Sequence, residues 1–310
     1  MNALRERSGV TTMSNGIRVR NPMPTNSLVL MMSLILTIGP LVASAQGPQA
    51  AHEGYADLKG VRIRYTDTGG SGIPVILLHA ATGNIESWEH QIPAFTAAGY
   101  RCITYDRRGW GRSITDPAAR QPGTAADDLL ALMDYLHIDR AHLVGSAAGA
   151  TVSIDFVLSF PQRVRSAVIA NAGGASVQDQ KFQEVSQRIK TAEFDSYPVE
   201  FRELGPSYRA SNPEGTRRWI ELTRMSRQNL AGPPQPVKNP TTMPLLETIK
   251  TPVLLMTGAA DLYAPPPLMH LYAARIKNAE SVVIPEAGHS AYWEQPDIFN
   301  RAVLEFIRKH

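Results

Sequence analysis

Short apolar runs alternate with longer amphipathic stretches along most of the chain. Six of these runs have the length and composition of strands buried on both faces, and they lie at residues 74–78, 100–105, 142–144, 164–170, 253–257 and 281–284. Helical stretches lie between or after them at 86–98, 124–136, 148–159, 267–276 and 296–309. Strands that alternate with helices need crossover connections on a parallel sheet. The pattern therefore predicts an α/β fold with a mostly parallel sheet flanked by helices.

Two segments depart from this alternation. Residues 55–68 alternate apolar and polar side chains around Lys59-Gly60, which is typical of a β-hairpin. The interval 175–242 has no convincing strand, and its helical pieces lie at 181–190, 199–204 and 216–227. A strand-free stretch of this length inside a compact domain is most simply an inserted lid. We therefore expect a core made of residues 46–174 and 243–310, with a helical cap at 175–242.

The first 45 residues have the features of a secretory signal peptide. An apolar run from Leu28 to Ile38 follows an Arg-bearing stretch, and the triplet Ala43-Ser44-Ala45 places a cleavage site after Ala45. The run is too short to span a bilayer, which needs about 20 apolar residues. We expect a periplasmic or secreted protein with no stable membrane insertion after the leader is removed. An uncleaved membrane anchor is the alternative.

Charge and composition exclude several classes of protein. The net charge is +3, but four of the 31 basic residues and one of the 28 acidic residues lie in the first 46 positions, so the remainder is neutral. No basic stripe marks a nucleic-acid surface. Cys102 is the single cysteine, which rules out an internal disulfide, and the eight histidines show no zinc spacing. We expect no metal and no cofactor, and the oligomeric state stays open.

Two polar segments follow predicted strands directly. The first is His79-Ala80-Ala81-Thr82-Gly83, whose small side chains let backbone N–H groups approach a substrate oxygen at the carboxyl edge of the sheet. A plain turn with a satisfied histidine is the alternative interpretation of that segment. The second segment runs from Asp106 to Ser113 and contains three arginines and two glycines. We interpret it as architectural, with local pairing of its charges, although a basic cluster can also bind an anion.

A third segment suggests where the chemistry takes place. Residues 143–150, Leu-Val-Gly-Ser-Ala-Ala-Gly-Ala, are a strand that turns abruptly into a helix through small residues, the form of a nucleophile elbow. Together with the two preceding segments, it resembles the α/β-hydrolase superfamily, in particular its capped esterase, lactonase and epoxide-hydrolase members. Thr257 to Asp261 is similar to that family's acid loop, and Pro285 to His289 is similar to its histidine loop. The resemblance covers the whole mature chain and implies an eight-stranded sheet.

The sequence departs from the family at the nucleophile position. The family's elbow reads Gly-x-Ser-x-Gly, and aligning it with Gly145 to Gly149 puts Ala147 where the serine belongs. A methyl group cannot form an acyl-enzyme. The resemblance implies catalytic roles for His289 and Asp261 with Ala147 at the nucleophile position, and an oxyanion site made by the N–H groups of Ala81 and Ala148. Substrate contacts are expected from Trp88, Ser146 and Tyr263.

Several explanations of Ala147 stay open. We favour a natural serine-less enzyme, since the family's aminoacrylate hydrolases of pyrimidine breakdown also lack the serine; a serine-to-alanine knockout and a displaced nucleophile at Ser146 are the alternatives. A neutral imidazole at His289, with an ordinary pKa of about 6.5, suits general-base work near neutral pH. We expect a hydrolase of a small, moderately apolar ester, lactone or other activated carbonyl compound. A proton-transfer or lyase-type enzyme and a ligand-binding pseudoenzyme are the other hypotheses.

Overall fold

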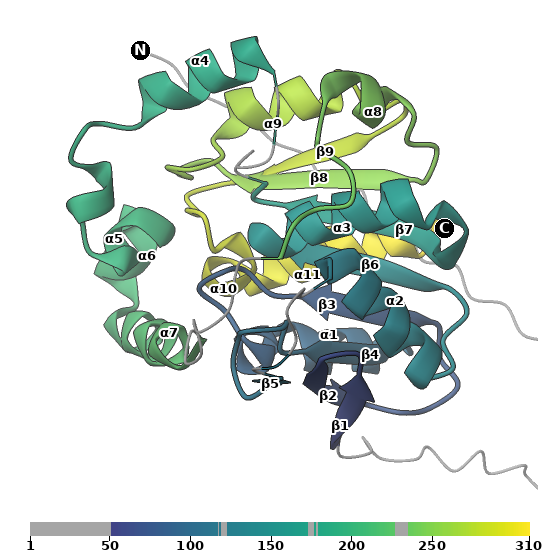
Figure 1. Cartoon of the computed structure of the whole chain (residues 1–310). Coiled ribbons are helices and arrows are strands. Elements are labelled where there is room, and N and C mark those ends of the chain that lie inside the picture. Colours follow the sequence, from purple (N-terminus) through teal and green to yellow (C-terminus); the bar gives the residue numbers. More distant parts are fainter. Residues whose placement is uncertain (1–50, 117, 119–122, 173–176, 178, 227–234) are drawn as a thin grey trace, which may run out of the picture. The chain divides into compact units, whose positions relative to one another are not determined.

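The structure is a computed structural model that describes residues 51–116, 118, 123–172, 177, 179–226 and 235–310 (Figure 1). The predicted leader, residues 1–45, lies outside the described residues, so export stays a prediction. Within the part that is described, no helix combines the length and the hydrophobicity needed to cross a membrane.

The fold is built on one mixed, mostly parallel sheet. Its strands run in the order β1-β2-β4-β3-β6-β7-β8-β9, with β5 paired to β2, so the described residues form nine strands where eight are expected. All pairs from β4 to β9 in this order are parallel, and β2 pairs antiparallel with β1, β4 and β5. The strands are β1 His52–Leu58, β2 Val61–Asp67, β3 Pro74–Leu78, β4 Arg101–Tyr105, β5 Ile114–Thr115, β6 Ala141–Ser146, β7 Val164–Ala170, β8 Val253–Gly258 and β9 Glu280–Ile284. The α/β fold predicted from the pattern is confirmed.

The extra strand β5 is only two residues long, too short to show an alternating pattern, so it could not be predicted from the sequence. The predicted hairpin is β1 with β2, and its turn uses Gly60 at a φ of 70°, a conformation that glycine adopts without steric cost.

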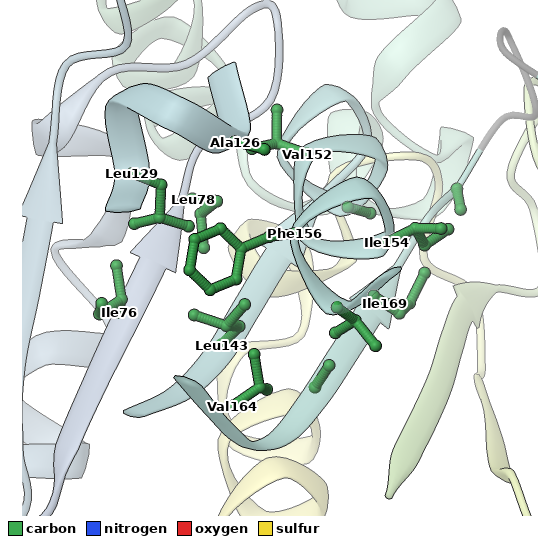
Figure 2. Packing of buried hydrophobic residues seen from close by; sticks show 14 of the residues in the cluster. Ile76, Leu78, Ala126, Leu129, Leu143, Val152, Ile154, Phe156, Val164 and Ile169 are labelled. Carbon is green, nitrogen blue, oxygen red and sulfur yellow. The ribbon is translucent and has the colours of Figure 1, made fainter. Parts of the chain in front are cut away.

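Helices cover both faces of the sheet. A first hydrophobic cluster packs α2 Ala125–Tyr135, α3 Ala148–Ser159 and α9 Pro266–Ala273 on one face. Figure 2 shows Phe156 of α3 at its centre, against Leu78, Leu129 and Leu143. A second cluster packs α1 Gln91–Ala97, α10 Ala291–Glu294 and α11 Pro296–Ile307 on the other face. The short helix η1 Ile85–Trp88 lies between β3 and α1, and η2 Pro161–Arg163 lies between α3 and β7. The two buried clusters fix the strands whose carboxyl ends carry the polar segments.

The described part of the interval between β7 and β8 contains helices and one isolated bridge, Val177 to Thr241, but no strand. Its helices are α4 Gln180–Ile189, η3 Phe194–Ser196, α5 Val199–Glu203, α6 Pro206–Ser211, α7 Pro213–Ser226 and α8 Met243–Glu247. In Figure 1, helices α5 to α7 lie on the same side of the sheet as α10. Helices α4, α5 and α7 match the expected pieces, whereas α6 and α8 were not expected. The division into core and cap stays a prediction.

Candidate active site

The turn between β6 and α3 is sharp and strained. Ala147 has a φ of 50° and a ψ of −109°, a conformation that is costly for a residue with a side chain, and its N–H donates to the carbonyl of Ala170 at 2.9 Å. Glycines on either side allow it: a Cβ on Gly149 would overlap the carbonyl oxygen of Leu78, and one on Gly145 would come within 2.5 Å of the carbonyl oxygen of Gly149. The packing therefore forces residue 147 to the outer edge of the turn, where it is half-buried.

His289 and Asp261 are brought together at the ends of β9 and β8. Nδ1 of His289 lies 2.9 Å from both carboxylate oxygens of Asp261. The same carboxylate accepts backbone N–H groups of Tyr263 and Ala264, each at 2.8 Å, so its orientation is fixed by the loop that follows β8. Nε2 of His289 makes no hydrogen bond to any described residue. The imidazole is thus anchored at one nitrogen and available at the other.

Asn171 is a further member of this site, one that the sequence analysis missed. It follows β7 with a φ of 52°, and its side-chain N–H group donates to Asp261 Oδ2 at 2.9 Å and to the carbonyl of Gly288 at 3.3 Å. It therefore joins the acid loop to the histidine loop. The only sign in the sequence was a polar residue directly after a buried apolar strand, a signal shared by many turns.

The charge state of His289 differs from the expectation. Burial disfavours the imidazolium, but the charges of Asp261 and Glu203 outweigh it and raise the pKa of His289 to about 9. Asp261 is also buried, yet the charge and hydrogen bond of His289 lower its pKa. The neutral imidazole expected from an ordinary pKa is thus wrong for this site at neutral pH. The physical reason is the charge of Asp261 together with that of a second carboxylate, Glu203, which comes from a distant part of the chain.

Glu203 lies at a junction where the end of α5 contacts the histidine loop. The carbonyl of Glu203 accepts the N–H of Ser290 at 3.1 Å. The carboxylate of Glu294 accepts the N–H of Gly205 at 2.7 Å and that of Gly288 at 2.9 Å. A Cβ on Gly288 would lie 2.5 Å from the nitrogen of Gly205, so the two segments are in close backbone contact. No sequence motif indicated this junction.

The predicted oxyanion groups lie where the chain leaves β3 and enters α3. Among the described residues, neither the N–H of Ala81 nor that of Ala148 donates a hydrogen bond, which leaves both free for a substrate oxygen. Leu78 ends β3, and its carbonyl faces Gly149 of the turn, so the two loops are adjacent. These N–H groups stay a predicted oxyanion site.

His79 is structural, in line with the alternative interpretation of its segment. Its Nδ1 lies 2.7 Å from the carbonyl of Ala80, and its Nε2 accepts the N–H of Arg107 at 3.1 Å. Trp110 also supports this loop, since its indole N–H donates to the carbonyl of Ala81 at 2.8 Å. Both ring nitrogens of His79 are therefore occupied by backbone.

The segment from Asp106 to Ser113 is architectural, as expected. Asp106 is fully buried and accepts the N–H groups of Ile85 and Arg112 at 3.0 and 2.8 Å. It also pairs with Arg64 at 3.2 Å. A Cβ on Gly111 would overlap the carboxylate of Asp106, which explains that glycine. These contacts fix the loop after β4 instead of exposing a charged surface.

The three expected substrate contacts differ in position. Tyr263 is half-buried beside the imidazole, with ring centroids of Tyr263 and His289 4.6 Å apart. Trp88 is fully buried and packs on Tyr292 in the core. Ser146 is also fully buried, and its hydroxyl has no partner in the described part of the chain. Only Tyr263 thus lies against the candidate catalytic histidine, and substrate binding by all three stays a prediction.

No metal site accompanies these residues within the described ranges, because no three His, Cys, Asp or Glu side chains gather as ligands there.

The chain is similar to proteins of known fold. The model described as "Alpha/beta hydrolase family" matches residues 75–302. A putative non-heme bromoperoxidase, BpoC, of Mycobacterium tuberculosis is 31% identical over 269 residues, covering 80% of this chain and 98% of the relative. A 2-hydroxy-6-oxononadienedioate/2-hydroxy-6-oxononatrienedioate hydrolase of Burkholderia vietnamiensis is 30% identical over 279 residues, covering 80% and 92%. The crystal structure of a hydrolase from Pseudomonas aeruginosa has a TM-score of 0.69 at 26% identity, covering 83% of this chain and 99% of that one.

Proposed function

The chain belongs to the alpha/beta hydrolase family and is an enzyme of that type, and from this premise we propose that it hydrolyses small, moderately apolar esters, lactones or other activated carbonyl compounds through His289 and Asp261, without a serine at the turn after β6. The observation that carries the proposal is the buried His289–Asp261 pair, joined at 2.9 Å, with the outer ring nitrogen left unbonded.

The turn at Ala147 supports a mechanism without a covalent intermediate. The methyl group of Ala147 offers no lone pair, so attack on the carbonyl carbon falls to water. The strained backbone there is the same turn that presents a nucleophile in this family, but here the side chain that it carries is a methyl group. The N–H groups of Ala81 and Ala148, which donate to no described residue, support the proposal that this site stabilises the oxyanion that forms. Protein groups then need only orient water and move protons.

A mechanism without a covalent intermediate requires a reactive substrate. Loss of the triad in well-studied serine enzymes leaves about 10³- to 10⁴-fold catalysis over water. Such a rate suffices for carbonyl compounds with a good leaving group or ring strain, and it is too slow for stable amides. The half-buried ring of Tyr263 beside the imidazole favours a substrate with an apolar part.

The test is an ester and lactone panel measured with the protein, with His289→Ala and with Ala147→Ser. We expect the unmodified protein to hydrolyse p-nitrophenyl acetate and small lactones, and His289→Ala to lose at least about 100-fold in kcat, the usual contribution of a proton-moving side chain. Glu286→Gln, on the same loop, is the matched control, since no hydrogen bond or ion pair to a described residue engages its side chain.

The variants separate the proposal from its alternatives. Activity that appears only in Ala147→Ser would identify a serine hydrolase whose nucleophile is missing. Exchange of a substrate's α-proton without hydrolysis, lost in His289→Ala, would identify a proton-transfer enzyme. Ligand binding without turnover in any of the three proteins would contradict the proposed hydrolysis outright.

A further inference from the structure

Glu203 is a buried carboxylate that the proposed mechanism does not yet use. It is the last residue of α5, only 7% exposed, and its Oε2 is enclosed without a hydrogen-bond partner among the described residues. No ion pair with a described lysine, arginine or histidine engages it either. Burying a carboxylate costs several kcal/mol unless it is paired. An unpaired, buried carboxylate beside the candidate active site is therefore a candidate for a part in the reaction.

The position of Glu203 is fixed by the histidine loop itself. Its carbonyl accepts the N–H of Ser290 at 3.1 Å, one residue after the candidate catalytic histidine. Its charge acts on His289 and Asp261, and on the phenol groups of Tyr263 and Tyr292. The backbone of Glu203 is therefore held directly beside the histidine loop, and the charge of its side chain acts on the imidazole from α5.

The other charged groups near this space are engaged elsewhere. Arg202 donates to the hydroxyl of Tyr263 at 3.0 Å and pairs with Asp195 at 3.4 Å. Glu294 accepts two backbone N–H groups of the junction. Arg202 and His289 are the cations whose charges act on Glu203, and Arg202 is thus engaged elsewhere, whereas no hydrogen bond or ion pair joins Glu203 to His289. Two proton-moving groups that are not bonded to each other can act on different oxygens of one reacting substrate.

We propose that Glu203, the buried carboxylate at the end of α5, takes the proton from the attacking water, while His289, held by Asp261 through Nδ1, donates a proton to the leaving group. This inference rests on the proposed hydrolase function. Glu203 is then a catalytic residue supplied by the helical segment, and it replaces the serine hydroxyl as the source of the nucleophile.

The reaction balances with these groups alone. The Glu203 carboxylate accepts a proton from water as the water oxygen bonds to the carbonyl carbon, and the carbonyl electron pair moves to an oxygen held by the free N–H groups. When the tetrahedral adduct collapses, the bond from carbon to the leaving oxygen breaks, and Nε2 of His289 gives that oxygen its proton. The proton on Glu203 then passes to His289, and the net change is ester plus water to acid plus alcohol.

The imidazolium required here agrees with the electrostatics of the site. Burial raises the pKa of Glu203, and the charge of His289 opposes that rise, while the pKa of His289 lies at about 9. The working form has an ionised Glu203 and a protonated His289. The rate should therefore rise with pH as Glu203 ionises and fall as His289 loses its proton near pH 9.

The experiment compares the full chain with Glu203→Gln, Glu203→Asp and His289→Ala, with Glu200→Gln on the same helix as the matched control. Hydrolysis of p-nitrophenyl acetate is measured from pH 5 to 10, and the His289 ring is titrated by NMR, its signal assigned by its loss in His289→Ala. We expect Glu203→Gln to lower kcat about 100-fold with KM within threefold, to remove the acid limb of the profile, and to lower the pKa of His289. Glu203→Asp should keep the acid limb at a reduced kcat, and Glu200→Gln should change neither readout.

Opposite results overturn the inference. If His289 is instead a simple base, Glu203→Gln lowers its pKa and raises activity at pH 7, which contradicts the role given to Glu203. A kcat within threefold of the unmodified protein, or an unchanged pKa of His289, contradicts it as well. Two other results would contradict the proposed hydrolase function instead. In the first, His289→Ala retains full activity. In the second, the unmodified protein hydrolyses no ester, although the NMR titration still shows that Glu203→Gln lowers the pKa of His289. If Glu203→Gln does not fold, Glu203→Asp decides through its acid limb.

Discussion

The raised pKa of His289 predicts a specific loss of stability at alkaline pH. Its pKa lies at about 9 in the folded protein, against about 6.5 in the unfolded chain, so the folded state holds the proton more tightly. The resulting stabilisation is fully present below pH 6.5 and disappears as the pH rises through 9. Linkage between these two values gives a loss on the order of 1–2 kcal/mol in the free energy of unfolding between pH 7.5 and pH 9.

The assay is urea unfolding at several pH values in this window, followed by tryptophan fluorescence, for the unmodified protein and for Asp261→Asn. Burial also raises the pKa of Cys102 to about 11, a group common to both proteins. Burial, with a smaller contribution from the charge of Asp261, raises the pKa of Glu294 to about 7, so Glu294 titrates mainly below this window. Asp261→Asn removes the charge that stabilises the imidazolium most. The slope of the free energy of unfolding against pH should therefore fall by at least half in this variant. Parallel pH dependences in the two proteins would refute the reasoning.

Three further perturbations test the packing around the site. Gly149→Ala places a methyl group against a main-chain oxygen of β3 and should lower the free energy of unfolding, measured with urea, by about 3 kcal/mol. Gly70→Ala is the control: no atom lies within 4 Å of the added methyl group, so it should lower that free energy only by the roughly 1–2 kcal/mol of its left-handed backbone. Equal losses in the two variants would contradict the packing argument. Asn171→Ala removes a hydrogen bond to the carboxylate of Asp261 and should lower kcat about 10- to 100-fold with little change in KM, measured with an activated ester; an unchanged kcat would assign Asn171 a structural role. Arg64→Met leaves a fully buried carboxylate unpaired and should destabilise the fold by about 3 to 5 kcal/mol in the same unfolding assay, and a loss below 1 kcal/mol would show that its ion pairs carry no net stability.

The sequence was sufficient where local pattern decides the structure. The runs at 74–78 and 164–170 coincide with β3 and β7, because continuous apolar stretches bounded by turn residues have few alternatives to a buried strand. The strained turn at Ala147 was also foreseeable, since small residues at 145 and 149 are what close packing of a helix on a strand end requires. Local pattern also predicted the strands at 253–257 and 281–284, and the resemblance to the family then identified the loops after them that carry Asp261 and His289.

The rest of the site depends on contacts between distant parts of the chain. Glu203 lies 86 positions before His289, and only the packing of α5 on the histidine loop brings its charge to the imidazole. The pKa of that imidazole could not be predicted without it. Asn171 illustrates the same limit, because one polar residue after a strand gives no sign of which carboxylate it will contact.

The carboxylate of Glu294 links the helical segment after β7 to the histidine loop. One of its oxygens takes the N–H of Gly205 at the foot of the helical segment, and the other takes the N–H of Gly288, immediately before the imidazole-bearing residue. Because one carboxylate accepts both N–H groups, a displacement of the chain at Gly205 would also disturb the backbone that leads into His289. The orientation of the imidazole is thereby coupled to the position of α5.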